Sequence, residues 1–175
     1  MKKPRSVIAS ILICFALVSC GGGVKDYSLN EDNFFLVMTN MLYFPEQYNG
    51  SKIDFNAFTY ILTDIDGNEY PLAVRKCSSG YGCNCGKDTI IGFILEYDGD
   101  FPEPKNQSED TVEKTWVHVE GEVKQGVKTD IKINSYDDKG EVVEGAYETV
   151  TFLTFVVEEL SLVEDYQNLN YYVTK

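Results

Sequence analysis

Residues 52–75 read KIDFNAFTYILTDIDGNEYPLAVR, and this stretch decides the fold. Its first half alternates apolar with polar residues, which is the period of a β-strand with one buried face, and the apolar run then thickens through residues 58–62. The sequence Asp66-Gly67-Asn68 interrupts this run before a second apolar segment begins. A turn of this kind between two apolar runs is typical of a β-hairpin. We therefore predict strands over residues 52–62 and 69–75.

The same criteria predict three further strands downstream of the hairpin, over residues 89–97, 115–123 and 148–162. Residues 98–113 hold two prolines and many charges, so we expect a solvated loop there. Residues 124–146 form a second polar insertion, with room for one short strand at 130–134.

One helix is expected upstream of the hairpin. Ser28 and Glu31 have the spacing of a capping box, which marks the start of a helix. Apolar residues then recur at the helical period until Pro45 ends the pattern. The members of this stripe are Phe34, Phe35, Val37, Met38, Met41 and Leu42.

One helix and about five strands separated by turn residues predict a mainly β domain. A small, curved antiparallel barrel resembling the OB (oligonucleotide/oligosaccharide-binding) fold, with five strands and an N-terminal α-helix, matches this count best. A β-sandwich is the alternative. We expect a single domain over residues 28–164 and a tyrosine-rich C-terminal tail over residues 165–175.

The N-terminus has the pattern of a bacterial lipoprotein signal peptide. Three basic residues within the first five precede an apolar run over residues 7–18, which is too short to span a bilayer as a mature helix. The sequence Leu17-Val18-Ser19-Cys20 follows directly and resembles a lipobox. We therefore predict a signal peptide over residues 1–19, lipidation (diacyl, including palmitate) of Cys20, and a short tether over residues 20–27. The alternative is an ordinary secretory signal peptide in which the cysteine is accidental.

The charge of the mature chain excludes several partners. The signal peptide removes three of the 15 basic residues, so 12 Lys and Arg face 28 Asp and Glu, a net charge of −16. Such a surface repels phosphate backbones and anionic lipid head groups. We therefore expect no nucleic-acid binding, and attachment of the domain to the extracytoplasmic face of the cell membrane through the lipid alone.

Three cysteines, Cys77, Cys83 and Cys85, lie within nine residues, in a loop rich in Gly and Ser between two predicted strands. Thiolates are soft ligands suited to zinc or copper(I). A closed zinc site needs a fourth ligand, for which Asp88 and the only histidine, His118, compete. Valines alternate with His118 along its strand, so we also expect His118 to point away from the core, and a surface histidine is the competing interpretation.

Oxidative chemistry gives two other interpretations of these cysteines. Outside the cytoplasm disulfides persist, so Cys77 could pair with Cys83 or Cys85 and leave one thiol over. A redox role would require a thiol of lowered pKa, for which Lys76 or Lys87 would supply positive charge.

Several short motifs resemble the YcgQ-type membrane proteins and their lipoprotein relatives. In that family two adjacent cysteines are followed by an Asp three residues later and by a Gly four residues after the Asp. Cys85, Asp88 and Gly92 have this spacing. The adjacent pair of cysteines is replaced here by Cys83-Asn84-Cys85. Residues 48–53 resemble the Tyr-x-Gly-Lys motif that precedes the first strand of the family. Residues 115–121 resemble its Trp-Val-x-Val-x-Gly strand, and Arg75 corresponds to an arginine that precedes the cysteines. The family has no settled biochemical function. The resemblance implies a metal-associated envelope protein that accompanies a membrane permease.

Enzymatic motifs are not found in the sequence. It contains no phosphate-binding loop ending in Lys-Ser/Thr, no Gly-x-Ser-x-Gly and no His-Glu-x-x-His. We therefore expect a non-enzymatic envelope lipoprotein, with a zinc-binding or permease-associated role, and with a disulfide-stapled interaction module of the envelope as the alternative.

Overall fold

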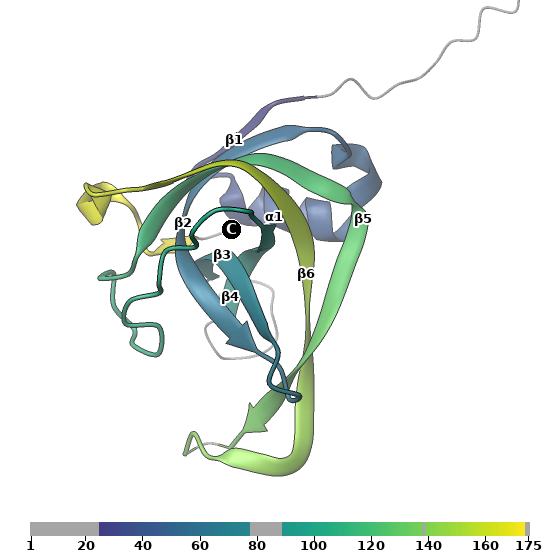
Figure 1. Cartoon of the computed structure of the whole chain (residues 1–175), viewed down its shortest axis with the longest axis vertical. Coiled ribbons are helices and arrows are strands. Elements are labelled where there is room, and N and C mark those ends of the chain that lie inside the picture. The colour runs from purple at the N-terminus through teal and green to yellow at the C-terminus, as the bar shows by residue number, and fades with distance from the viewer. Residues whose placement is uncertain (1–24, 78–88, 138, 174–175) are drawn as a thin grey trace, which may run out of the picture.

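The computed structural model describes residues 25–77, 89–137 and 139–173 (Figure 1). Within them the chain is mainly β with one α-helix, as expected, and its strands form a mixed sheet. The elements follow the order β1 (Tyr27–Leu29), α1 (Phe34–Tyr43), a 3-10 turn η1 (Pro45–Tyr48), β2 (Lys52–Thr63), β3 (Glu69–Cys77), β4 (Thr89–Glu96), β5 (Trp116–Tyr136), β6 (Val142–Leu162), a 3-10 turn η2 (Tyr166–Asn168) and β7 (Tyr172–Val173).

The predicted hairpin is confirmed, and its turn has a clear cause. β2 and β3 pair antiparallel from Phe58↔Val74 to Thr63↔Glu69. In the turn, one carboxylate collects four donors: Asp64 Oδ1 accepts the backbone N–H groups of Asp66 (2.9 Å) and Asn68 (2.8 Å), and Asp64 Oδ2 accepts Asn68 Nδ2 (2.8 Å) and the Tyr70 hydroxyl (3.2 Å). Side-chain bonds of this type hold the chain in a tight reversal.

The strands of the sheet are ordered β1-β2-β5-β6-β4-β3-β7, and β2 also pairs with β3. The first half of β2 pairs with β5 and its second half with β3, so the pairings among β2, β3, β4, β6 and β5 run in a cycle. The expectation of a purely antiparallel sheet is wrong, because β1–β2, β4–β6 and β3–β7 pair in parallel. Parallel strands cannot be joined by a tight turn and need a long connection. The chain between β4 and β6 includes the whole of β5, so it is long enough to return to the same end of the sheet and allow a parallel pair.

Two local predictions also differ from the structure. Ser28 does not cap a helix, because it pairs with Asp54 in the short strand β1, and its hydroxyl donates to that carboxylate (3.0 Å). α1 begins instead at Phe34, whose N–H reaches the carbonyl of Asn30 (2.9 Å). The polar segment 124–146 is mostly strand, since β5 and β6 continue as a long hairpin in which Ile131 pairs with Val150.

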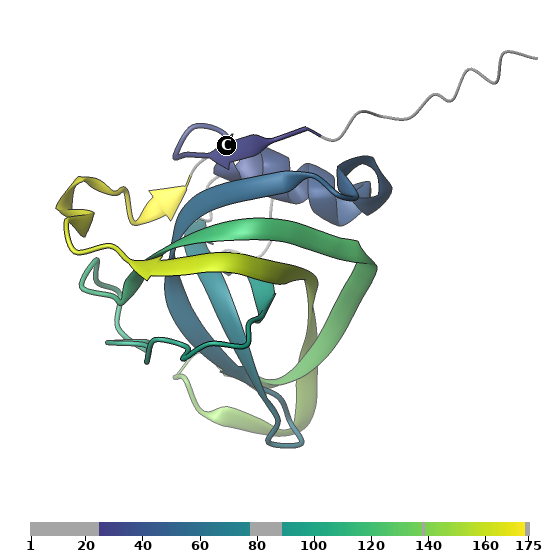
Figure 2. The ribbon, with the colours of Figure 1, turned by 45° about the horizontal axis from the view of Figure 1, so that its top comes forward.

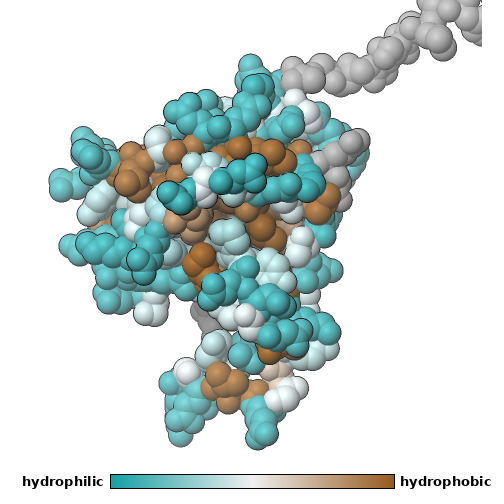
Figure 3. Space-filling view, viewed as in Figure 1, coloured by the Kyte–Doolittle hydropathy of each residue, from teal (hydrophilic) through white to brown (hydrophobic). Residues whose placement is uncertain are grey.

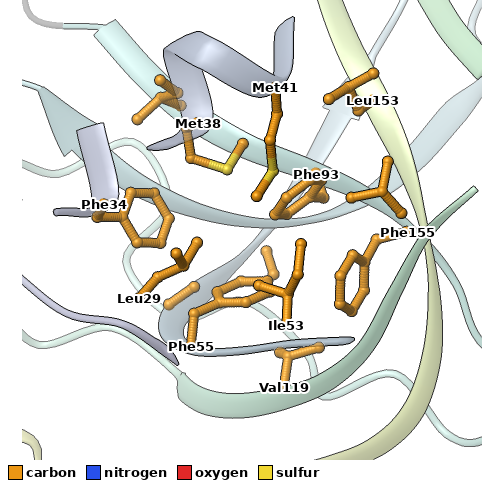
Figure 4. Close-up of a cluster of buried hydrophobic side chains, with 14 of the residues drawn as sticks. Leu29, Phe34, Met38, Met41, Ile53, Phe55, Phe93, Val119, Leu153 and Phe155 are labelled. Atoms are coloured by element: carbon orange, nitrogen blue, oxygen red, sulfur yellow. The ribbon is translucent and has the colours of Figure 1, made fainter. Parts of the chain in front are cut away.

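Buried apolar residues form two clusters on opposite faces of the strands, because neighbours in one strand point to opposite sides. In the first cluster, Phe55, Phe93 and Phe155 have ring centroids 4.9–5.5 Å apart although their strands β2, β4 and β6 are not all neighbours. Figure 4 shows these rings turned toward one another beneath Met38 and Met41 of α1. α1 therefore covers one end of the cycle of strands, as Figures 1 and 2 both show.

The second cluster includes Phe58, Leu72, Val74, Trp116 and Phe152. The C-terminal segment covers part of it: Tyr171 stacks on Phe58 with centroids 5.5 Å apart and is buried. Residues 165–173, expected to be a tail, thus add η2 and β7 to the packed domain. No helix within the described residues is long and apolar enough to cross a membrane.

Candidate functional site

The base of the cysteine loop is a well-defined part of the sheet. Cys77 is the last residue of β3 and pairs with Thr89, the first residue of β4. The predicted ends of these two strands are therefore neighbours, as expected. Cys83, Cys85, Lys87 and Asp88 lie between them in the sequence and fall outside the described residues. Cys20, near the N-terminus, also falls outside them.

The Cys77 side chain points into the first cluster and is 2 % exposed. On the side of β3 away from β4, Cys77 pairs with Val173 of β7, whose side chain is 1 % exposed. A thiol in this position packs as a small apolar group. Cys77 therefore helps to close the core at the point where the loop leaves the sheet.

Lys76 lies beside Cys77 in sequence but on the opposite face of β3. Its ammonium pairs with Asp110 (3.1 Å), which also accepts the Tyr172 hydroxyl (2.9 Å). These two partners hold the pKa of the Asp110 carboxyl below its usual value. The positive charge of Lys76 is thus directed toward the β4–β5 connection rather than toward the Cys77 thiol.

His118 lies where the alternation predicted. It is partly exposed, whereas Val117 and Val119 on either side are buried in the same cluster as Cys77. Its Nδ1 lies 2.9 Å from Asn56 Oδ1, and its Nε2 lies 3.2 Å from Glu120 Oε1. The imidazole therefore leaves the sheet from the face opposite to the Cys77 thiol, and both ring nitrogens have oxygen partners.

Arg75 is the most deeply buried charged residue of the described chain, at 1 % exposure. Its guanidinium donates to the carbonyls of Asn56 (3.0 Å) and Asn170, and it lies 3.7 Å from the Glu31 carboxylate. It also lies over the Trp116 ring, 5.0 Å from the centroid. Burial lowers the pKa of Arg75, while the Glu31 carboxylate acts in the opposite direction.

These contacts join four segments of the chain, from the turn before α1 to the C-terminal residues. Arg75 and His118 both line a small pocket of about 140 Å³, together with Glu31, Asp54 and Asn56. The sequence analysis considered Arg75 only through the family resemblance. The sequence did offer one local indication of its burial. Arg75 lies two residues from both Ala73 and Cys77 on the same strand, and therefore on the face of the strand that points into the core.

A larger groove of about 730 Å³ follows the second cluster. Its apolar lining includes Phe58, Tyr60, Phe152 and Tyr171. Gln107 also lines it, but the amide is committed to β2, since Nε2 donates to the Ile61 carbonyl (2.9 Å) and Oε1 accepts its N–H (2.8 Å). The residues named first thus give the groove apolar walls. The Gln107 amide satisfies backbone groups at the edge of β2 that would otherwise be open to another strand.

Lys114 anchors the β4–β5 connection that borders this groove. The residue is 4 % exposed, and its ammonium donates to the backbone carbonyls of Asn106, Gln107 and Glu109. Desolvation lowers the pKa of Lys114. Sequence analysis gave no indication of this role, because the carbonyls that hold the charge come from the backbone.

Among the described residues, no group of three or more His, Cys, Asp or Glu side chains is placed to hold a metal ion. Comparison with protein-family models, with curated proteins and with solved structures gave no match.

Proposed function

We propose that this protein is a non-enzymatic lipoprotein of the cell envelope, anchored through Cys20 on the extracytoplasmic face of the membrane. The signal-like N-terminus and the lipobox support the anchor. The acidic surface supports the absence of a nucleic-acid partner. The resemblance to the YcgQ-type family supports a membrane permease or another envelope protein as partner.

We further propose that the domain is an OB-like barrel. The cycle of pairings β2–β3–β4–β6–β5 and the division of β2 between two partners support this assignment, since an OB-fold is a five-stranded, partly open barrel. Function still has to be argued from the site rather than from this fold.

The cysteine loop is the proposed metal site, with zinc as the ion. The observation that carries the proposal is the pairing of Cys77 with Thr89, because it brings the two residues that flank the other cysteines in the sequence next to each other. Thiolates of Cys77, Cys83 and Cys85 are donors of the type that zinc prefers. The oxygen partners of His118 favour Asp88 as the fourth ligand.

The second candidate is a disulfide-stapled interaction module, and the burial of Cys77 favours it. A cysteine at 2 % exposure in an apolar cluster suits a structural bond as well as a metal. In this case Cys77 would pair with Cys83 or Cys85, and the acidic surface would be the docking face.

Elemental analysis and thiol titration of residues 21–175, purified without oxygen, separate the two candidates. The metal site predicts one zinc ion per chain, lost in Cys83→Ser and in Cys85→Ser but retained in Ser79→Ala, a control in the same loop. The staple predicts no metal and one titratable thiol, which becomes three after reduction. Three free thiols without metal would contradict both candidates.

A further inference from the structure

The outer side of α1 carries exposed apolar side chains and no charge, although the chain as a whole is acidic. The β5–β6 hairpin at the other end of the domain also exposes large apolar side chains, namely Tyr136, Val142, Val143 and Tyr147, so the position of each end relative to the anchor has to decide between them. Leu36 and Tyr43 are 56 % and 74 % exposed, on the side of α1 opposite to buried Met38 and Met41. Phe44 directly follows α1, is 49 % exposed, and its ring centroid lies 6.4 Å from that of Tyr43. Leu36 and Tyr43 are seven residues apart and so lie on one stripe of the helix. Residues 33–45, NFFLVMTNMLYFP, include no charged side chain, although a quarter of the whole chain is charged.

The attachment of α1 to β1 fixes where this face lies relative to the anchor. The Asn33 side chain donates to the Ser28 carbonyl (3.0 Å) and accepts the Asn30 N–H (2.8 Å), which joins the start of α1 to the end of β1. Both Figure 1 and Figure 2 show α1 and β1 at the same end of the domain. In the face seen in Figure 3, hydrophilic side chains lie along the edges, and hydrophobic ones gather in the upper part and again at the lower tip.

Chain length then limits the distance to the membrane. Six residues separate Cys20 from Tyr27, so the two Cα atoms are seven steps apart along the chain and, even fully extended, at most about 25 Å apart in space. An anionic membrane repels a domain of net charge −16, so a domain held this close turns an uncharged surface toward the lipid. Tyrosine, phenylalanine and leucine are the side chains that suit the bilayer interface.

We propose that the Leu36–Tyr43–Phe44 face of α1 rests in the interfacial layer of the bilayer and orients the domain on the membrane. The inference rests on the proposed lipoprotein anchor. It places the far end of the domain, the β5–β6 hairpin around Tyr147, toward the aqueous side.

Depth-dependent fluorescence quenching tests this orientation in the full-length, lipidated protein. The protein is reconstituted into vesicles of phosphatidylcholine and anionic phosphatidylglycerol, in which a fraction of the lipid carries brominated acyl chains. Trp116, the only native tryptophan, is 1 % exposed and gives the background. Tyr43→Trp places an indole on the proposed contact face, and Tyr147→Trp is the matched control, because Tyr147 is 53 % exposed on the distal hairpin.

Brominated lipid should quench Y43W well beyond wild type and leave Y147W at the wild-type level. Adding Leu36→Asp to Y43W should reverse most of the extra quenching, because a charge on the same stripe opposes insertion. Protein that floats with the vesicles but shows equal quenching in Y43W and Y147W overturns the docking inference and leaves the anchor intact. Self-association of the helix face, detected as concentration-dependent crosslinking without quenching, would also overturn it. Failure of the wild type to float would instead refute the proposed lipoprotein.

Discussion

Gly92→Ala is the substitution for which the structure makes the sharpest stability prediction. Gly92 lies in β4 opposite Val74 of β3. A Cβ atom at this position would lie 2.0 Å from the Ala73 carbonyl oxygen and 2.8 Å from the Val74 Cα. Both are backbone atoms of the neighbouring strand, so no side-chain rotation relieves the overlap.

The magnitude follows from the size of this overlap. An ordinary van der Waals contact requires 3.4 Å or more, so β3 and β4 would have to separate by more than an ångström at the centre of the sheet. Over-packing in a well-packed core costs about 1–3 kcal/mol, and rigid backbone on both sides places this site at the upper end. About 3 kcal/mol corresponds to a melting temperature lower by about 6–12 °C for a chain of this length.

Thermal unfolding of residues 21–175, followed by circular dichroism, measures this change. Gly99→Ala is the matched control, because the added Cβ there meets only the Tyr97 ring, which can rotate away. We expect a shift of about 2 °C or less for the control. Equal shifts for G92A and G99A would refute the argument that close backbone approach requires glycine at position 92.

Three further predictions concern single residues. Hydrogen bonds from Asn68 hold the pKa of Asp64 in the folded state below its usual value. The ionised Asp64 carboxylate therefore stabilises the fold fully above the usual pKa, and this stabilisation is lost as pH falls through the lower pKa of the folded state. Asp64→Asn should flatten the fall in melting temperature below about pH 4. Arg75→Met should reduce the free energy of unfolding in urea by about 3 kcal/mol and increase amide exchange around Asn170, whereas Arg75→Lys should show a smaller loss. Unchanged exchange would contradict the view that Arg75 holds the C-terminal segment against the sheet. Cys20→Ser should release the protein from the detergent phase, and partitioning like wild type would refute the anchor.

The hairpin was predictable because its signals are local. The alternation from Ile53 to Ala57 and the turn centred on Gly67 determine β2 and β3 without help from the rest of the chain. The helix start was not predictable in the same way, because Ser28 is recruited by Asp54, a partner 26 residues away. The β4–β6 pairing is likewise set by tertiary packing rather than by any local pattern.

The short strand expected at residues 130–134 lies within β5, but the continuity of β5 and β6 through the rest of residues 124–146 was missed. Ile131 and Ile133 alternate with Asp130 and Lys132, the pattern of a half-buried strand, but the surrounding polar residues favoured a loop. Gly92 shows the opposite case. A family motif pointed to it, and its physical reason, the backbone of β3 at van der Waals distance, becomes visible only in the folded sheet.

The β3–β7 pairing has a consequence for how the protein acquires its fold. Lys76 pairs with Tyr172 across nearly a hundred residues, and the first core cluster includes both Leu29 and Val173. Domains dominated by such distant contacts fold in milliseconds to seconds, because long loops must close before the contacts form. No N-terminal fragment of the domain can complete this core. Folding therefore waits for β7, and a chain still being synthesised would keep this core incomplete until residues 172–173 have been added.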